Sequence, residues 1–320
     1  DTSDISKSVR AGRRFKILIG GIEAGGTKII CGVGEVKDGT IRILSEMRFP
    51  TTTASRVLPE IIAWFKQYSI ESLGIASFGP LDLKKDSHTY GYIKATPKKG
   101  WQDVDFVGPF ARAFAIPIEF DTDVNGAALG ESVYGAGRGC QVVAYMTVGT
   151  GIGVGLYTEG KLLHGLVHPE AGHMLIQRHP KDTYEGSCPF HKDSFLPGGC
   201  LEGYACGPAI QQRWGAPGET LHNRKEVWEM EAYYLGQGVS NLVLLYSPDK
   251  IIIGGGVMHQ DNLFQMVRDE VKKNLNGYIH SDMVEGNLEN YIVPPMLKDH
   301  AGLIGAIELG KRAWENENKQ

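Results

Sequence analysis

Two stretches of the sequence carry strands and glycine turns in the same order, and this repeat constrains the fold more than any other feature. The segments 15–22 and 28–36 are apolar runs typical of buried strands, and the adjacent Gly25 and Gly26 separate them. Further strands at 40–49 and 72–78 follow, with an amphipathic helix at 57–68 between them.

The second stretch repeats this order. Strands at 142–148 and 152–158 flank Gly149-Thr150-Gly151, and a third strand is expected at 161–164. A helix at 225–246 then leads to a strand at 250–253. This internal duplication predicts an α/β protein whose two related lobes face each other across a cleft.

The bulk composition argues against several classes of function. The formal net charge is −4 and the pI is near 6.2, so a nucleic-acid-binding surface is not expected. No apolar run reaches the roughly 18 residues that cross a bilayer, which argues against a membrane protein. Five cysteines, an odd number, favour a reducing compartment, and we expect a cytoplasmic protein. The polar segment 1–14 is expected to be a tail.

The glycine turns have the composition of anion sites. Adjacent glycines let backbone N–H groups point outward, and Thr27 and Lys28 add a hydroxyl and a charge to Gly25 and Gly26. The second turn offers the same chemistry, so the two turns together favour a polyphosphate ligand. A third glycine cluster, at 254–256, follows a strand. It has two interpretations: a surface of bare backbone for a purine, or a tight turn of the chain. No G-x-x-x-x-G-K-[ST] motif is present.

Polar residues at one strand end form a candidate catalytic site. Asp123 follows a strand and precedes the helical run 127–134, where a carboxylate that faces a cleft can orient a hydroxyl and accept its proton. We expect one of Asp121 and Asp123 to cap that helix instead.

A scattered set of cysteine and histidine residues forms a candidate metal site. His173, Cys188, His191 and Cys200 offer two imidazoles and two thiolates, which suit tetrahedral Zn²⁺. On sequence alone this pattern is weak, because buried cysteines are common.

Six motifs in order resemble the ROK sugar kinases of the actin, Hsp70 and hexokinase-like superfamily. They are GIEAGGTK at 21–28, SFGPLD at 77–82, DTDVNGAALGE at 121–131, TVGTGIG at 147–153, HPEAGH at 168–173 and IIGGGV at 252–257. Two further segments, at 90–101 and 178–191, resemble the zinc-containing bacterial-type fructokinases.

The resemblance implies duplicated actin/hexokinase-like (ribonuclease H-like) lobes and an ATP-dependent hexose kinase, most similar to fructokinases. Asp123 would be the base, and Mg²⁺ would accompany ATP, with Glu23 as a ligand through water in place of the more usual Asp. The implied sugar-binding positions are Gly79, Asn125, Glu170, His173 and Glu202. The implied ATP-binding positions are Gly25, Gly26, Thr27, Lys28, Thr150, Gly151, Gly254, Gly255 and Gly256.

The resemblance also implies a structural zinc ion on the four cysteine and histidine residues. The segment 192–199 is longer here than in those relatives. It either forms a surface loop or moves Cys200 away from the metal site. The zinc loop, 173–200, would present Glu170 and Glu202 to the sugar.

The domain boundaries follow from the same resemblance. We expect an N-terminal lobe at 15–120, joined by a C-terminal helix near 301–315, and a C-terminal lobe at 121–300.

The resemblance also implies a homodimer, which is common in this family. The sugar could also be glucose, mannose or an N-acylmannosamine. A ROK regulator is less favoured, because only about twenty residues precede the first glycine turn, and the catalytic motif disfavours a pure nucleotide-binding scaffold.

Overall fold

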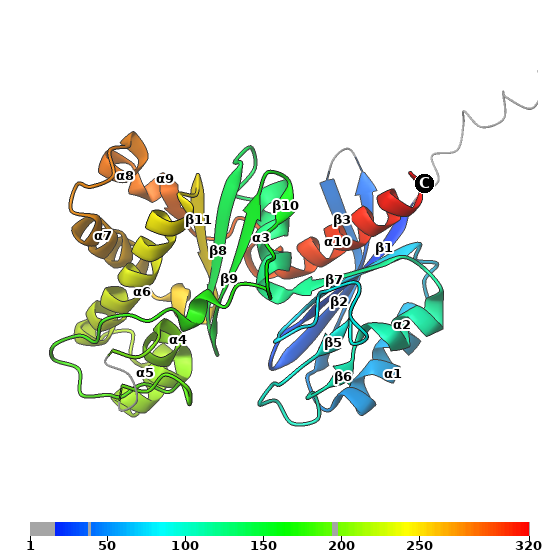
Figure 1. Ribbon diagram of the computed structural model, residues 1–320, viewed down its shortest axis with the longest axis horizontal. Helices are drawn as coiled ribbons and strands as arrows, with labels where there is room; N and C mark the ends of the chain where they lie inside the picture. Colours follow the sequence, from blue (N-terminus) through cyan, green and yellow to red (C-terminus); the bar gives the residue numbers. More distant parts are fainter. Residues whose placement is uncertain (1–16, 38–39, 194–197, 320) are drawn as a thin grey trace, which may run out of the picture.

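Two five-stranded sheets form the framework of the computed structural model, which describes residues 17–37, 40–193 and 198–319 (Figure 1). The expected tail at 1–14, the first two residues of the expected strand at 15–22 and residues 38–39 lie outside the described residues.

The first sheet has the order β3-β2-β1-β4-β7. Its strands are β1 (Leu18–Ala24), β2 (Lys28–Lys37), β3 (Thr40–Pro50), β4 (Ser72–Ser77) and β7 (Ile118–Thr122). The strand β1 pairs antiparallel with β2 and parallel with β4, and β4 pairs parallel with β7. The carboxyl ends of β1, β4 and β7 therefore meet at one edge of the sheet.

The second sheet repeats this arrangement in the order β10-β9-β8-β11-β12. Its strands are β8 (Val142–Val148), β9 (Ile152–Thr158), β10 (Lys161–Leu162), β11 (Lys250–Gly254) and β12 (Ile292–Val293). The pairings of β8 with β9 and β11 match those of β1 with β2 and β4. The predicted duplication is therefore confirmed strand by strand, although β10 ends two residues earlier than expected.

Helices cover both sheets and join them. The longer ones are α1 (Ala54–Phe65), α2 (Val107–Phe114), α3 (Asp123–Tyr134), α5 (Gly207–Trp214), α6 (Lys225–Tyr246), α7 (Leu263–Leu275) and α10 (Ala301–Glu317). The shorter elements are β5 (Tyr92–Ile93), β6 (Val104–Asp105), α4 (Leu201–Ala205), α8 (Asp282–Gly286), α9 (Leu288–Tyr291), η1 (Ala171–His173), η2 (Gly218–Thr220), η3 (Gly256–His259) and η4 (Lys298–His300). The helix predicted at 225–246 coincides with α6, whereas α1 begins and ends three residues before the helix predicted at 57–68. In the described part of the chain no helix is both long and apolar enough to cross a membrane.

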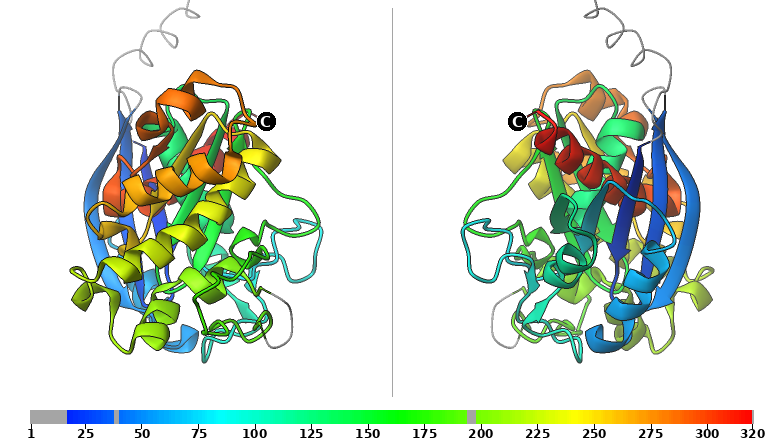
Figure 2. Two further views of the ribbon diagram at one scale, coloured as in Figure 1. Left: turned by 90° about the vertical axis from the view of Figure 1, so that its left-hand side faces the viewer. Right: turned by 90° about the vertical axis from the view of Figure 1, so that its right-hand side faces the viewer.

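The helices α3 and α10 lie between the two sheets (Figures 1 and 2). Leu303 and Ile307 of α10 pack on Ile19 and Ile30 of the first sheet. Alanines of α3 pack on the second sheet in a cluster of Ala127, Ala128, Val143, Tyr145, Ile252 and Ala301. The pair of helices thus forms the joint between the lobes.

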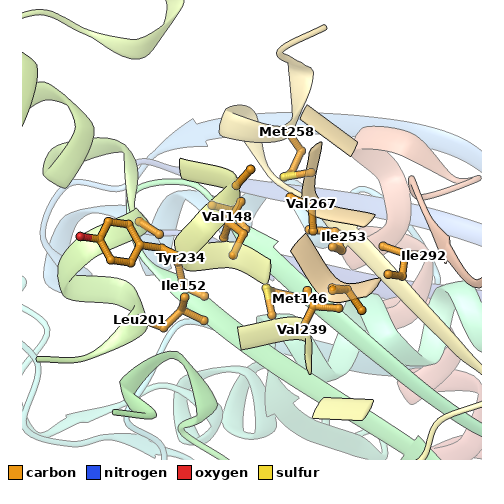
Figure 3. Packing of buried hydrophobic residues seen from close by; sticks show 14 of the residues in the cluster. Met146, Val148, Ile152, Leu201, Tyr234, Val239, Ile253, Met258, Val267 and Ile292 are labelled. Carbon is orange, nitrogen blue, oxygen red and sulfur yellow. The ribbon is translucent and has the colours of Figure 1, made fainter. Parts of the chain in front are cut away.

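The larger core fills the outer side of the second sheet. Met146, Ile253 and Ile292 project from its strands toward Val239 of α6 and Val267 of α7 (Figure 3). All five side chains are fully buried. Burial of such side chains contributes about 1.5–3 kcal/mol each, so this core holds α6 and α7 on the sheet.

We predict that Gly305→Ala destabilises the joint between α3 and α10. A Cβ at Gly305 would lie 1.7 Å from the carbonyl oxygen of Gly126, a backbone atom that cannot rotate away. The free energy of unfolding, measured by denaturant titration, should fall by about 1–3 kcal/mol or more. Gly286→Ala is the matched control, because no atom of the described residues lies within 4 Å of its added Cβ. Equal stability of the two variants would contradict the close contact.

Candidate active site

A cavity of about 750 Å³ opens between the lobes. Five of the ionisable side chains that line it are Glu23, Lys28, Asp123, Lys298 and Asp299. Glu23 and Lys28 belong to strands of the first sheet, Asp123 begins α3, and Lys298 and Asp299 lie on η4 just before α10. Tyr145 of β8 and Ile253 of β11 line the same cavity from the second sheet, so the cleft expected from the duplicated lobes is present. The predicted residues Gly254, Gly255 and Gly256 line the same cavity.

Asp123 is the first residue of α3, directly after β7. The hydroxyl of Thr122 caps this helix by accepting a hydrogen bond from the N–H of Asn125 at 3.1 Å. The prediction that Asp121 or Asp123 would be the cap is therefore wrong. Asp121 instead accepts hydrogen bonds from the N–H of Thr122 and the amide of Asn125. Asp123 does not cap the helix, and it lines the cavity between the lobes.

The carboxyl group of Asp123 holds its proton more tightly than an ordinary aspartate. Burial raises its pKa from 3.8 to about 6, with a further rise from the nearby charge of Glu170. Hydrogen bonds from backbone N–H groups and the proximity of His168 lower the pKa, but less than burial raises it. A carboxylate with a pKa near neutrality is suited to accept a proton from a hydroxyl.

Glu23, near the end of β1, is the second carboxyl group in the cavity. Burial raises its pKa to about 7, and the charge of Asp123 adds to this rise. Its Oε2 is buried and has no hydrogen-bond partner among the described residues. A buried carboxylate oxygen without a partner, beside Asp123 and Asp299, suits a divalent cation. The residues present therefore fit the Mg²⁺ that the family resemblance implies.

The first glycine hairpin, residues 25–28, lies at the tip of β1 and β2. The N–H of Gly25 donates to the carbonyl of Lys28 at 2.9 Å, and the Thr51 hydroxyl donates to the carbonyl of Gly25 at 2.8 Å. The ammonium group of Lys98 donates to the carbonyl of Gly26. Gly26, Thr27 and Lys28 are exposed, so their polar groups are available to a ligand.

The second glycine hairpin, residues 149–151, lies at the equivalent tip of β8 and β9. The N–H of Gly149 donates to the carbonyl of Gly151 at 2.9 Å, and its own carbonyl accepts from Gly207 of α5. Gly149, Thr150 and Gly256 line a second cavity of about 880 Å³. Because Gly256 and His259 line both cavities, an elongated ligand can extend from one into the other.

The third glycine cluster requires glycine at its centre. Gly255 has a φ of +95°, and a Cβ there would lie 2.3 Å from the carbonyl oxygen of Val148. A tight turn between β11 and η3 therefore explains part of the sequence pattern. A Cβ added at Gly256 would meet no atom of the described residues within 4 Å, so this backbone is open toward the two cavities that it lines.

The four predicted metal ligands lie together. The side-chain nitrogen or sulfur atoms of His173, Cys188, His191 and Cys200 are all within 4.8 Å of one another. Sulfur-to-nitrogen distances are 3.4 Å for Cys188–His191, 3.8 Å for Cys188–His173 and 3.6 Å for Cys200–His173. Tetrahedral zinc with ordinary bond lengths places sulfur and nitrogen about 3.5 Å apart. Cys200 is thus not displaced from the group, although 194–197 lie outside the described residues.

Glu202 connects the cysteine and histidine cluster to the second glycine hairpin. It lies on α4, two residues after Cys200, and its Oε2 accepts a hydrogen bond from the N–H of Ile152 at 2.9 Å. Its Oε1 lies 3.9 Å from Nε2 of His173, whose other ring nitrogen faces Cys188 and Cys200. The predicted sugar position Glu202 is therefore fixed between the cluster and the hairpin.

The other predicted sugar positions divide into two groups. Glu170 and Gly79 lie on either side of the buried ring of His168. Asn125 does not share this place. It is 1% exposed, and its side chain donates to Asp121 and accepts from the N–H of Leu156. Asn125 thus supports the start of α3 from beneath.

Sequence reasoning missed several residues of the site. His168 lies beside Glu170 and accepts a hydrogen bond from Leu81, Lys98 contacts the first glycine hairpin, and Lys298 and Asp299 line the main cavity. His168 and Lys98 lie inside motifs that carry the family resemblance, which is the one signal that could have drawn attention to them.

The comparisons with known proteins agree with this geometry. The family model described as "ROK family" matches residues 19–313. The chain belongs to the ROK family. A protein of Bacillus subtilis strain 168 is 45% identical over 94% of this chain and 97% of its own length. The fructokinase of Zymomonas mobilis is 42% identical over 95% of this chain and 99% of its own.

A solved structure has the same fold. The ROK family glucokinase of Streptomyces griseus, in complex with glucose and AMPPNP, matches with a TM-score of 0.68 and 25% identity, over 92% of this chain and 99% of its own. The predicted family and the predicted fold of duplicated actin/hexokinase-like lobes are confirmed.

Proposed function

We propose that this ROK family protein is an ATP-dependent fructokinase, which converts D-fructose and ATP to D-fructose 6-phosphate and ADP. The position of Asp123 is the main support for phosphotransferase activity. Its carboxyl group lines one cavity together with Lys28 and the glycine cluster 254–256. The fructokinase name of the relative at 42% identity supports fructose as the sugar. Glucose, mannose and N-acylmannosamine remain the alternative substrates.

In this proposal Asp123 is the catalytic base. Its carboxylate orients the sugar hydroxyl and accepts the proton as the phosphoryl group transfers to the oxygen. Phosphoryl transfer passes through a loose transition state, so positioning and neutralisation of charge contribute more than the strength of the base. Glu170, Glu202, His173 and Gly79 are the proposed sugar positions beside it, and Asn125 acts only through the packing of α3.

The two glycine hairpins are the proposed phosphate sites. Gly25, Gly26, Thr27 and Lys28 on one lobe and Thr150 and Gly151 on the other would bind the phosphates, and Gly256 would face the adenosine. Glu23 would hold Mg²⁺ through water, and the ion would neutralise charge on the phosphates.

The cysteine and histidine cluster is the proposed site of a structural zinc ion. Four ligands from the protein leave no position for a catalytic water. The ion would fix two segments that carry sugar residues, since His173 ends η1 beside Glu170 and Cys200 precedes α4 with Glu202. The homodimer and the cytoplasmic location stay predictions.

The first prediction concerns the substrate. Among fructose, glucose, mannose and N-acetylmannosamine, fructose should give the highest kcat/KM in an ADP-release assay with ATP. The product should carry phosphate on O6, which NMR of the sugar phosphate would show. A preference of about tenfold or more for another hexose would contradict fructokinase while leaving a sugar kinase.

Asp123→Asn should lower kcat by about 10²-fold or more, because the amide cannot accept the proton. Nucleotide and sugar affinity, measured by calorimetry, should be retained. For the wild type, kcat/KM should fall as the pH drops from about 7 to below 6, since the carboxyl groups of Glu23 and Asp123 then take up protons. Asp86→Asn, at an exposed position, is the control. Near wild-type turnover of Asp123→Asn would remove Asp123 from this role.

Purified protein should contain one zinc ion per chain. Cys188→Ser and Cys200→Ser should each lose the zinc ion, and kcat/KM for the sugar should fall. ATP affinity should be kept, because neither glycine hairpin supplies a ligand to the cysteine and histidine cluster. Cys140→Ser, a cysteine outside the cluster, should keep the metal. Elemental analysis decides the matter, and a wild-type protein without zinc would overturn the proposal.

A further inference from the structure

His168 occupies a buried position between the two lobes, outside every role assigned above. The residue is 6% exposed. Its Nε2 accepts a hydrogen bond from the backbone N–H of Leu81 at 3.1 Å, and Leu81 lies on the segment that follows β4 of the first sheet. His168 itself lies on the segment after β10 of the second sheet.

These contacts fix the tautomer of the ring. An imidazole nitrogen that accepts from an N–H group carries no proton, so the proton of the neutral ring is on Nδ1. That nitrogen faces Oε1 of Glu170 at 3.4 Å. At this distance, longer than an ordinary N–H···O hydrogen bond, the protonated Nδ1 and the Glu170 carboxylate are polar neighbours, and the ring limits where the carboxylate can lie.

The segment held by Nε2 is also part of the proposed sugar site. A Cβ at Gly79 would lie 3.4 Å from both Cε1 and Nε2 of His168, so the ring is in contact distance of this turn. The other side of the turn is fixed by the N–H of Lys94, which donates to the carbonyl of Pro80 at 2.7 Å. With His168 in place, residues 79–81 are held from both sides.

Glu170 is held from two directions as well. His168 faces its carboxylate, and its backbone carbonyl accepts from the N–H of His173, a member of the cysteine and histidine cluster. The Glu170 side chain is nevertheless 49% exposed, so it remains open to a ligand.

We propose that His168 is a positioning residue of the sugar site, which sets the Glu170 carboxylate and the turn at 79–81 of the opposite lobe in one arrangement. This inference rests on the proposed sugar-kinase function. It requires that the loss of His168 weakens sugar binding and leaves ATP binding intact, because in the described part of the chain the contacts of its ring are with Leu81, Glu170 and Gly79 and not with a glycine hairpin.

Two conservative variants separate the two polar contacts of the ring, the hydrogen bond from Leu81 and the contact with Glu170. The amide of asparagine reaches the position of Nδ1, so His168→Asn keeps a donor for Glu170 and loses the acceptor for Leu81. The longer glutamine reaches the position of Nε2, so His168→Gln keeps the acceptor and loses the donor. His168→Ala loses both, and His88→Asn, at an exposed position of the first lobe, is the control.

The test measures hexose and ATP dissociation constants by calorimetry, KM for both substrates, and Tm, for the wild type and each variant. We expect sugar affinity and sugar KM to worsen by about tenfold in His168→Asn and His168→Gln, with a larger loss in His168→Ala. ATP constants should stay within about twofold, and His88→Asn should match the wild type. A general loss of folding would instead move both substrates and Tm together.

The possible outcomes distinguish a failure of the inference about His168 from a failure of the proposed function. Sugar constants of His168→Asn and His168→Gln within about twofold of the wild type would overturn the inference, as would equal losses for sugar and ATP. If the wild type binds glucose or mannose better than fructose, the fructokinase proposal fails and His168 is judged on the preferred hexose. A wild type that binds no hexose would overturn both.

Discussion

The close contact between α3 and α10 is the constraint on which the site depends. Glycine at 126 and 305 lets the two backbones touch, and each helix is buried against a different sheet. The position of one lobe relative to the other therefore follows from this crossing. Asp123 is the first residue of α3, and Glu23 packs against Gly302 in the first turn of α10. One helix contact thus places both carboxyl groups at the same cavity.

The same placement sets two electrostatic effects against each other. A helix N-terminus favours a negative charge by about 0.3–1 kcal/mol. The rise of the Asp123 pKa from 3.8 to about 6 corresponds to about 3 kcal/mol against ionisation. The effect of burial and of the neighbouring carboxylates on the ionisation of Asp123 is therefore larger than that of the helix N-terminus. A cation between Glu23 and Asp123 would reverse the balance by removing their mutual repulsion, so the proposed Mg²⁺ and the proposed base Asp123 would be compatible in one cleft.

The sequence predicted local elements well because their signals are local. Strand pairs around Gly25 and Gly149, and the helix over 225–246, follow from periodicity and turn residues within about twenty positions. The cap of α3 was wrong because Asp121, Thr122 and Asp123 are all good caps in isolation. The Asp121 carboxylate is engaged by Asn125 nearby and by His164, which is distant in sequence, and the capping role falls to Thr122. His168 gave no signal beyond its place in the HPEAGH motif, since its partner Leu81 is 87 residues away.

The proposed sugar side of the cleft differs from the proposed phosphate side in the contacts that fix its shape. Each glycine hairpin is closed by a hydrogen bond within a few residues, so its shape is set locally. Glu170 and Glu202 belong to short segments with little regular structure, η1 and α4, which cannot hold a carboxylate in place by themselves. Long-range contacts supply what these segments lack: His168 and the cysteine and histidine cluster for Glu170, and Ile152 with the same cluster for Glu202. Because those contacts include one across the lobes, the geometry of the proposed sugar site depends on the relative position of the lobes, whereas the closing hydrogen bond of each glycine hairpin lies within one lobe.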